Sequence, residues 1–79
     1  MDIYKTGKFI AEKRKEQGLT QKALAEKVGV TDKAISKWER GLSYPDISLL
    51  LSLAECLNVT VTEILNGNSI EEMKMELSD

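Results

Sequence analysis

The strongest constraint on the fold comes from residues 21–41, which read QKALAEKVGVTDKAISKWERG. A helix-turn-helix needs a small residue where its helices cross, a glycine where the turn takes a positive φ, and apolar groups in the angle between the helices. Ala25, Gly29, Ile35 and Trp38 occupy the fifth, ninth, fifteenth and eighteenth positions of this stretch, where those needs arise. Each residue alone is weak evidence, but together in register they predict a helix-turn-helix. The angle should be filled by Leu24, Val28, Val30, Ile35 and Trp38.

Helices are expected along the whole chain, because no stretch alternates apolar and polar residues for the length of a strand. Thr20, Thr31 and Asp46 are typical helix-capping residues, and Thr60 with Glu63 has the spacing of a capping box. These capping residues mark where helices begin, and glycines mark where they end. Together they predict helices over about residues 3–17, 21–28, 32–40 and 47–57, and a fifth helix that ends near residues 66–67. The predicted fold is therefore all-α, a compact five-helix bundle over residues 1–67.

Residues 68–79 form an acidic tail outside this predicted bundle. Ser69 and Glu72 repeat the capping-box spacing, and Ile70, Met73 and Leu77 would lie on one side of a short helix. The tail is expected to be such a helix or the beginning of a linker to a further domain.

The composition excludes several classes of function. The chain of 79 residues has no histidine and a single cysteine, Cys56, so His-based catalysis and a zinc site are not expected. No glycine-rich phosphate loop or nucleophile–base pair appears, and neither an enzymatic activity nor a cofactor is predicted. The absence of a signal peptide and of an apolar run of membrane length, together with the lone cysteine, leads us to expect a cytoplasmic protein.

The net charge of −2 conceals a difference between the two halves of the chain. Residues 1–45 carry ten Lys and Arg against six Asp and Glu, a balance of +4, whereas residues 46–79 carry one against seven, a balance of −6. A basic half of this kind favours an anionic partner, although charges that only solubilise the protein would give the same balance.

The helix predicted over residues 32–40 has one apolar and one polar side. At about 100° per residue, Ala34, Ile35 and Trp38 share the side that faces the bundle. The other side is a narrow polar ridge, and a helix of that width fits the major groove of B-DNA. This polar ridge carries Asp32, Lys33, Ser36, Lys37 and Arg40.

Individual roles follow from positions on this ridge. Lys33 and Lys37 are predicted to read bases, most naturally guanine O6 and N7, rather than only to solubilise the surface. Asp32 is ambiguous, because it could accept from cytosine N4 or simply favour the positive end of the helix dipole. Ser36 is expected to face the groove.

Contacts with the DNA backbone are expected around the ends of the helix and in the following loop, from Thr31, Arg40, Ser43 and Tyr44. Arg40 could instead complement the helix dipole, and Tyr44 could only cover the loop.

The segments RKEQGLTQKALAEKVGVTDKAISKWERGLSYPD and LLLSLAECLNVTVTEILNG resemble the phage-repressor and Cro-like helix-turn-helix family, the XRE-type transcriptional regulators. The resemblance covers about residues 5–67. It implies the lambda-repressor-like DNA-binding fold and a dimeric regulator, a repressor in the first instance, on a palindromic site in double-stranded DNA. Family base readers are often uncharged amides at the positions of Asp32, Lys33 and Lys37, so the operator sequence cannot be transferred to this chain.

The resemblance also implies roles for residues outside the ridge. Gln21 matches a glutamine that holds a phosphate and braces the recognition helix, and Lys22 beside it is a weaker phosphate candidate. Leu49 and Val61 match positions that face the partner subunit of a homodimer. The apolar side of the tail is expected to pack across this dimer surface. The alternative is that the apolar groups of this surface are merely covered by the fifth helix and the tail of the same chain.

Arg14 and Glu39 place charges on the buried sides of their helices, where a charge needs a partner. The family pattern pairs an arginine with a glutamate at these positions. A largely buried ion pair is therefore predicted, with two charges that reach the surface along their aliphatic stems as the alternative.

Two other functions remain open from the sequence. An antitoxin would use the same DNA-binding fold and bind a partner protein through the tail. A purely protein-binding module would fit the acidic net charge, but the +4 balance of the half with the motif argues against it. Steep weakening of DNA binding as salt rises would distinguish a DNA-binding protein from such a module.

Overall fold

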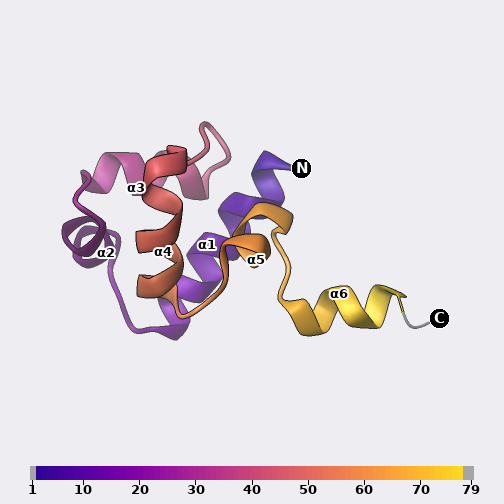
Figure 1. The fold of residues 1–79 in the computed structure, drawn as a ribbon. Coiled ribbons are helices and arrows are strands. Elements are labelled where there is room, and N and C mark those ends of the chain that lie inside the picture. The colour runs from indigo at the N-terminus through magenta and orange to yellow at the C-terminus, as the bar shows by residue number, and fades with distance from the viewer. Residues whose placement is uncertain (1, 78–79) are drawn as a thin grey trace.

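The computed structural model describes residues 2–77, without the side chain of Leu77, and consists of helices joined by short loops. In order these are α1 (Ile3–Glu16), α2 (Gln21–Val28), α3 (Asp32–Glu39), a 3₁₀ turn η1 (Ile47–Leu49), α4 (Leu50–Leu57), α5 (Val61–Asn66) and α6 (Ile70–Leu77). The all-α prediction is confirmed, with α1 to α5 in a compact bundle and α6 as a further helix (Figure 1). No helix within the described residues is long and apolar enough to cross a membrane.

Side-chain caps fix where several helices begin. The hydroxyls of Thr20, Thr31 and Thr60 accept hydrogen bonds from backbone N–H groups of α2, α3 and α5, as their types predict. The capping box of Thr60 and Glu63 is complete. The helix predicted over residues 47–57 is in fact divided into η1 and α4, because the Leu49 amide donates to the Asp46 carbonyl three residues before it and closes a tighter turn.

The core lies where α1 to α5 meet, and its fully buried apolar residues are Ile10, Leu24, Ile35, Leu53, Leu57 and Ile64. The apolar residues Leu50, Leu53, Ala54 and Leu57 recur at helical spacing and form the buried side of α4. On α1, Thr6 and Phe9 are also buried, although the sequence did not single them out. The Thr6 hydroxyl donates to the Ile64 carbonyl at 3.0 Å and so joins α1 to α5 without an unpaired polar group.

The helix-turn-helix is formed by α2 and α3, as predicted. Gly29 ends α2 with φ +85°, a conformation that only glycine adopts without strain. Ala25 is buried at the crossing of the two helices. Behind them α1 lies unusually close to α3, since a Cβ on Gly7 would collide with the Trp38 carbonyl oxygen and lie 2.9 Å from that of Glu39.

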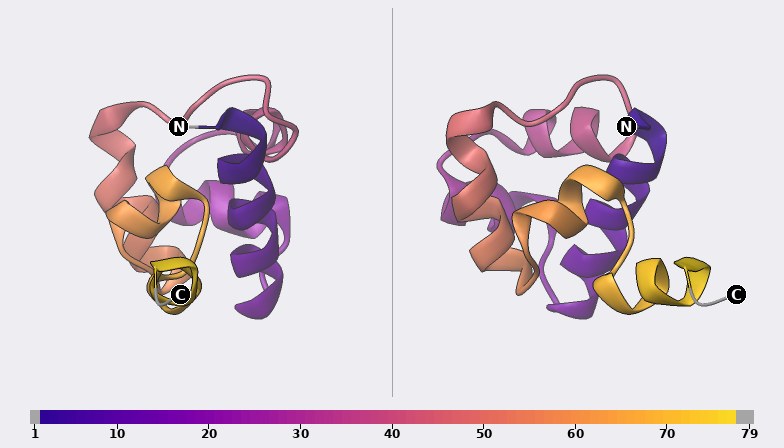
Figure 2. Two further views of the ribbon diagram at one scale, coloured as in Figure 1. Left: turned by 90° about the vertical axis from the view of Figure 1, so that its right-hand side faces the viewer. Right: turned by 45° about the vertical axis from the view of Figure 1, so that its right-hand side comes forward.

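The short helix α6 projects from the bundle on the side away from α3 (Figures 1 and 2). Its first turn is tied to α5, because the Ile70 amide donates to Glu63 Oε2 at 2.8 Å, and it is capped by Ser69, whose Oγ accepts from the Glu72 amide at 3.1 Å. The expectation that the tail packs across the surface around Leu49 is wrong for this structure, since these bonds direct α6 away from α4. The side chain of Leu77, part of that expectation, lies outside the described residues.

Candidate nucleic-acid interface

The polar ridge of α3 is presented by the burial of the opposite side of the helix. Ile35 and Trp38 are buried in the core and fix the rotation of α3 about its axis. Thr31 Oγ1 accepts from the Ala34 amide at 3.2 Å and fixes where α3 begins. As a consequence the predicted ridge lies at the surface, with Ser36 half-buried and the other members exposed, namely Asp32, Lys33, Lys37 and Arg40.

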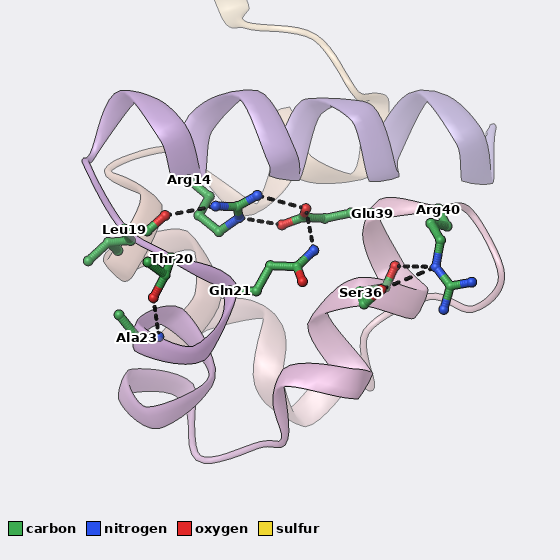
Figure 3. Close-up of polar contacts among 8 residues, drawn as sticks. All are labelled: Arg14, Leu19, Thr20, Gln21, Ala23, Ser36, Glu39 and Arg40. Atoms are coloured by element: carbon green, nitrogen blue, oxygen red, sulfur yellow. Dashed lines mark hydrogen bonds and ion pairs between the residues drawn. The ribbon is translucent and has the colours of Figure 1, made fainter.

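An ion pair braces the back of this ridge (Figure 3). Arg14 Nε lies 2.6 Å from Glu39 Oε2, and Arg14 Nη2 donates to Glu39 Oε1 at 3.0 Å. The two side chains are only 11% and 8% exposed, so the largely buried pair that the sequence predicts is present. The hydrogen bond with Glu39 raises the pKa of Arg14 above its ordinary value. Arg14 Nη1 also donates to the Leu19 carbonyl at 2.8 Å, which ties α1, the loop before α2 and the end of α3 together.

Gln21 extends this brace to the first turn of α2. Its Nε2 donates to Glu39 Oε1 at 3.0 Å, so the carboxylate of Glu39 accepts from two side chains on two different helices (Figure 3). An amide nitrogen carries two N–H groups. One of them is therefore left for a further acceptor at the surface beside α3.

A second polar contact lies on the ridge itself. Arg40 Nε donates to Ser36 Oγ at 3.2 Å and to the Ser36 carbonyl at 3.3 Å, one turn back along α3 (Figure 3). The sequence predicts separate DNA contacts for Ser36 and Arg40 and not this hydrogen bond between them. Their separation of four residues is the signal that could have revealed it, because such residues are neighbours on a helix surface.

The remaining residues predicted to contact DNA do not all lie with the ridge. Lys22 is exposed on the first turn of α2, and Ser43 is half-buried in the loop after α3. Tyr44 lines an apolar hollow of about 470 Å³ with residues of α1, η1, α4 and α5. None of its neighbours in that hollow comes from α3, which favours the alternative in which Tyr44 covers the loop.

The two residues predicted to face a partner subunit are half-buried. Leu49 and Val61 both pack against the core of their own chain. The apolar side chains that are most open on the same elements are Ile47 and Leu51, which are 85% and 66% exposed. Residues 47–53 have more apolar side chains than one buried stripe needs, and the sequence places Ile47, Leu49 and Leu51 beside that stripe as candidates for a surface that pairs with a second subunit.

The ridge of α3 carries an excess of positive charge. Glu39 is neutralised by Arg14, which leaves three cations, Lys33, Lys37 and Arg40, against the carboxylate of Asp32. Within residues 2–77 no group of three or more His, Cys, Asp or Glu side chains could hold a metal ion. The arrangement can therefore offer hydrogen-bond donors and positive charge to an anionic surface, on a helix narrow enough for a DNA groove.

Comparison with known proteins agrees with this geometry. The family HTH_3, described as helix-turn-helix, matches residues 10–64. The HTH-type transcriptional activator BcrR of Enterococcus faecalis is 40% identical over 57 residues, which are 72% of this chain and 28% of that protein. Repressor protein C2 of Salmonella phage P22 is 35% identical over 68 residues, which are 86% of this chain and 32% of that protein. This chain thus spans about a third of the length of either relative.

A solved structure shares the fold. The crystal structure of the P22 c2 repressor in complex with a synthetic operator superposes with a TM-score of 0.77 at 36% identity, over 80% of this chain and 96% of that one. The chain accordingly belongs to the XRE-type helix-turn-helix family of transcriptional regulators and has the lambda-repressor-like fold.

Proposed function

We propose that residues 1–67 bind double-stranded operator DNA in a sequence-specific manner, with α3 in the major groove. The observation that carries the proposal is the exposed ridge of α3, which holds three cations and is fixed from behind by Arg14, Gln21 and Glu39. A rigid ridge loses little conformational entropy on binding, which favours recognition of one sequence over others. Repression is the simplest mode of regulation, because a bound domain obstructs its DNA without further contacts.

The proposed contacts follow from where the side chains lie. Lys33 and Lys37 read bases, and the free N–H of the Gln21 amide binds a phosphate. Asp32 either accepts from cytosine or only stabilises the start of α3. Further backbone contacts are proposed for Thr31, Lys22, Arg40 and Ser43, and for Tyr44 only through its hydroxyl.

A gel-shift series at rising salt tests this function. The duplex used is the one enriched by the wild-type chain from a DNA library with a randomised central segment. Binding should weaken steeply as salt rises, and Lys33→Ala should weaken it by about 1–3 kcal/mol with relaxed preference at one base pair. Lys74→Ala on α6 is the matched control and should leave affinity unchanged. Failure to enrich any sequence, or affinity that is indifferent to salt, would contradict the proposal.

We also propose that the chain binds DNA as a homodimer. One helix as short as α3 reads too few base pairs to define a unique site, and two-fold pairing on a palindrome doubles the sequence that is read. The proposed dimer surface contains Leu49 and Val61, together with the exposed apolar side chains of Ile47 and Leu51.

A second candidate function is that of an antitoxin, in which the tail binds a partner protein. The observation in its favour is that α6 projects from the bundle with apolar side chains, such as Ile70, partly exposed. Removal of residues 68–79 should then leave DNA affinity unchanged and abolish protection against a co-expressed toxin. Loss of DNA affinity on this truncation would instead assign the tail to DNA binding or to the dimer.

A further inference from the structure

The start of α1 lies against the backbone that ends α3. A Cβ on Gly41 would lie 2.5 Å from Tyr4 Cδ1 and 3.0 Å from Tyr4 Cε1, so the tyrosine ring rests on this glycine. Gly41 has φ +73° and directly follows Arg40, the last member of the ridge. Figure 2 shows the start of α1 beside the loop that follows α3. The ring of Tyr4 therefore touches the chain at the point where the ridge ends.

Two features hold this ring in place. Asp2 Oδ1 accepts from the Tyr4 amide at 2.9 Å, which fixes where α1 begins. One turn later, Gly7 lies so close to the carbonyl oxygens of Trp38 and Glu39 that there is no room for a Cβ. Since α1 and α3 are in such close contact, Tyr4 keeps its position relative to the ridge.

The hydroxyl group of Tyr4 is unused by the described part of the chain. Within residues 2–77 it has no hydrogen-bond partner, and the residue is 69% exposed. A tyrosine whose ring is seated and whose polar end is in water suits an interface that is apolar at one end and wet at the other. Tyrosine is also among the side chains that commonly donate to DNA phosphates.

We infer that Tyr4 binds a phosphate of the DNA backbone from outside the helix-turn-helix, with its ring seated on Gly41 and its hydroxyl as the donor. The inference rests on the proposed function, since it requires α3 in the major groove. A helix in that groove lies between two phosphate backbones, so residues beyond its end meet a strand rather than base edges. Arg40 and Ser43, which lie on either side of Gly41, are proposed above as backbone contacts. Tyr4 extends this set of donors onto α1.

Two properties distinguish this contact from those proposed for the ridge. A hydrogen bond to phosphate adds affinity without sequence preference, unlike the base contact of Lys33. A phenolic hydroxyl is uncharged at neutral pH, so it displaces no counterion from the DNA, unlike the guanidinium of Arg40. Loss of the Tyr4 hydroxyl should therefore change neither the preferred sequence nor the salt dependence of binding.

The first test compares wild type with Tyr4→Phe, which keeps the ring on Gly41 and removes only the hydroxyl. Gel shifts measure affinity for the duplex that wild type enriches from a randomised library, for its single-base variants, and at rising salt. Tyr4→Phe should bind every duplex about three- to tenfold more weakly, the effect of one hydrogen bond, with the salt dependence of wild type. Thr62→Val removes an exposed hydroxyl from α5 and is the matched control, which should bind like wild type.

A phosphate scan tests the contact itself. In each duplex of the scan, one phosphate is replaced by an uncharged methylphosphonate. Wild type should lose affinity at every phosphate that it contacts. Tyr4→Phe should lose less than wild type at one of these phosphates and as much at the others, because a contact that is already absent cannot be lost again. Thermal melts should show both variants folded, since exposed substitutions change stability little.

Three results would overturn the inference. Wild-type affinity in Tyr4→Phe would remove the hydroxyl from the interface. A loss confined to some of the single-base variants would place the hydroxyl at a base edge. Equal responses of wild type and Tyr4→Phe at every methylphosphonate would show that the hydroxyl binds no phosphate. If the wild-type chain enriches no sequence at all, the proposed function itself fails, and this is seen before any variant is compared.

Discussion

At the scale of single residues, Glu39 is where three segments of the chain converge. Its carboxylate accepts from Arg14 on α1 and from Gln21 on α2, while its own backbone ends α3. A carboxylate that is 8% exposed is stabilised only as long as these donors remain. Removal of one partner therefore costs more than the net value of the pair, because it leaves a buried charge unpaired.

For Arg14→Ala we expect a loss of about 3–5 kcal/mol in the free energy of unfolding, since Glu39 keeps only the amide of Gln21. Arg14→Lys should lose less, because it retains the charge without the paired geometry. Lys15→Ala, an exposed neighbour on α1, should change stability by no more than about 0.5 kcal/mol. Urea unfolding of the three variants measures this. A loss in Arg14→Ala no larger than that in Lys15→Ala would mean that the pair contributes nothing.

At the scale of elements, Glu63 joins α5 to α6. Its Oε1 accepts from the Thr60 amide at 2.9 Å and its Oε2 from the Ile70 amide at 2.8 Å, so one carboxylate caps two successive helices. The hydrogen bond from the Thr60 amide, and after it the bond from the Ile70 amide, lower the pKa of Glu63 below its ordinary value of 4.5. A lowered pKa in the folded state means that the carboxylate stabilises the fold at neutral pH, and that this contribution is lost as pH falls from 4.5 through the folded-state pKa.

We expect Glu63→Gln to be less stable than wild type at neutral pH and to loosen the first turn of α6. The difference in unfolding free energy between the two proteins should shrink below pH 4.5, because the wild-type carboxylate is then being protonated as well. Urea melts at neutral pH and below pH 4.5 measure the difference in stability. Amide exchange at Ile70 measures the loosening of the first turn of α6. Glu55→Gln on α4 is an exposed control. A difference that stays constant with pH would show that the charge of Glu63 has no part in the joint.

The close approach of α1 to α3 gives a second prediction at this scale. Replacing a glycine inside a helix by alanine normally adds about 1 kcal/mol of stability. Gly7→Ala should instead lose about 3 kcal/mol, because the new Cβ meets two carbonyl oxygens of the α3 backbone. At Gly29 there is open space for a Cβ, so Gly29→Ala should lose only the 1–2 kcal/mol or so of backbone strain. Thermal or urea melts rank the two variants, and a stabilised Gly7→Ala would refute the tight packing.

Most elements could be predicted from the sequence because their signals are local. A threonine cap and a glycine stop delimit α2, and they lie within a few residues of the helix itself. What escaped prediction depends on contacts between distant residues. Burial of Thr6 requires the Ile64 carbonyl, 58 residues away, and the direction of α6 depends on the bond of Ile70 with Glu63. The ridge of α3 was predictable for the same reason as α2, because its threonine cap and its apolar side lie within a few residues of the helix itself.

At the scale of the whole molecule, the charged faces are well separated. In Figure 1, α3 lies at the upper left and α6, which carries Glu71, Glu72 and Glu76, projects at the lower right. This arrangement keeps the acidic helix out of the way of a DNA phosphate backbone bound at α3. It also leaves the apolar surface of η1 and the start of α4 uncovered, with Ile47 the most exposed of its members. Within residues 2–77, this is the surface that we propose for contact with a second subunit.

We expect the second subunit to contact the exposed apolar side chains of η1 and α4. Leu49→Glu would put a charge into a half-buried position and damage the fold. The exposed residues Leu51 and Ile47 therefore test the interface without this complication. Leu51→Glu and Ile47→Glu should remain folded, because their side chains are largely in water already. Wild type should occupy a palindrome with half-sites about one helical turn apart as a cooperative pair. Each variant should bind one half-site at a time and lose cooperativity.

Gel shift and sedimentation on the palindromic duplex measure the stoichiometry directly. Met75→Glu puts the same charge on α6, away from the proposed interface, and should keep two chains on each duplex. Because the interface repeats by symmetry, each substitution places two like charges across the two-fold axis, and their repulsion adds to the lost apolar contact. If Leu51→Glu and Ile47→Glu both still occupy the palindrome as cooperative pairs, the dimer uses another face.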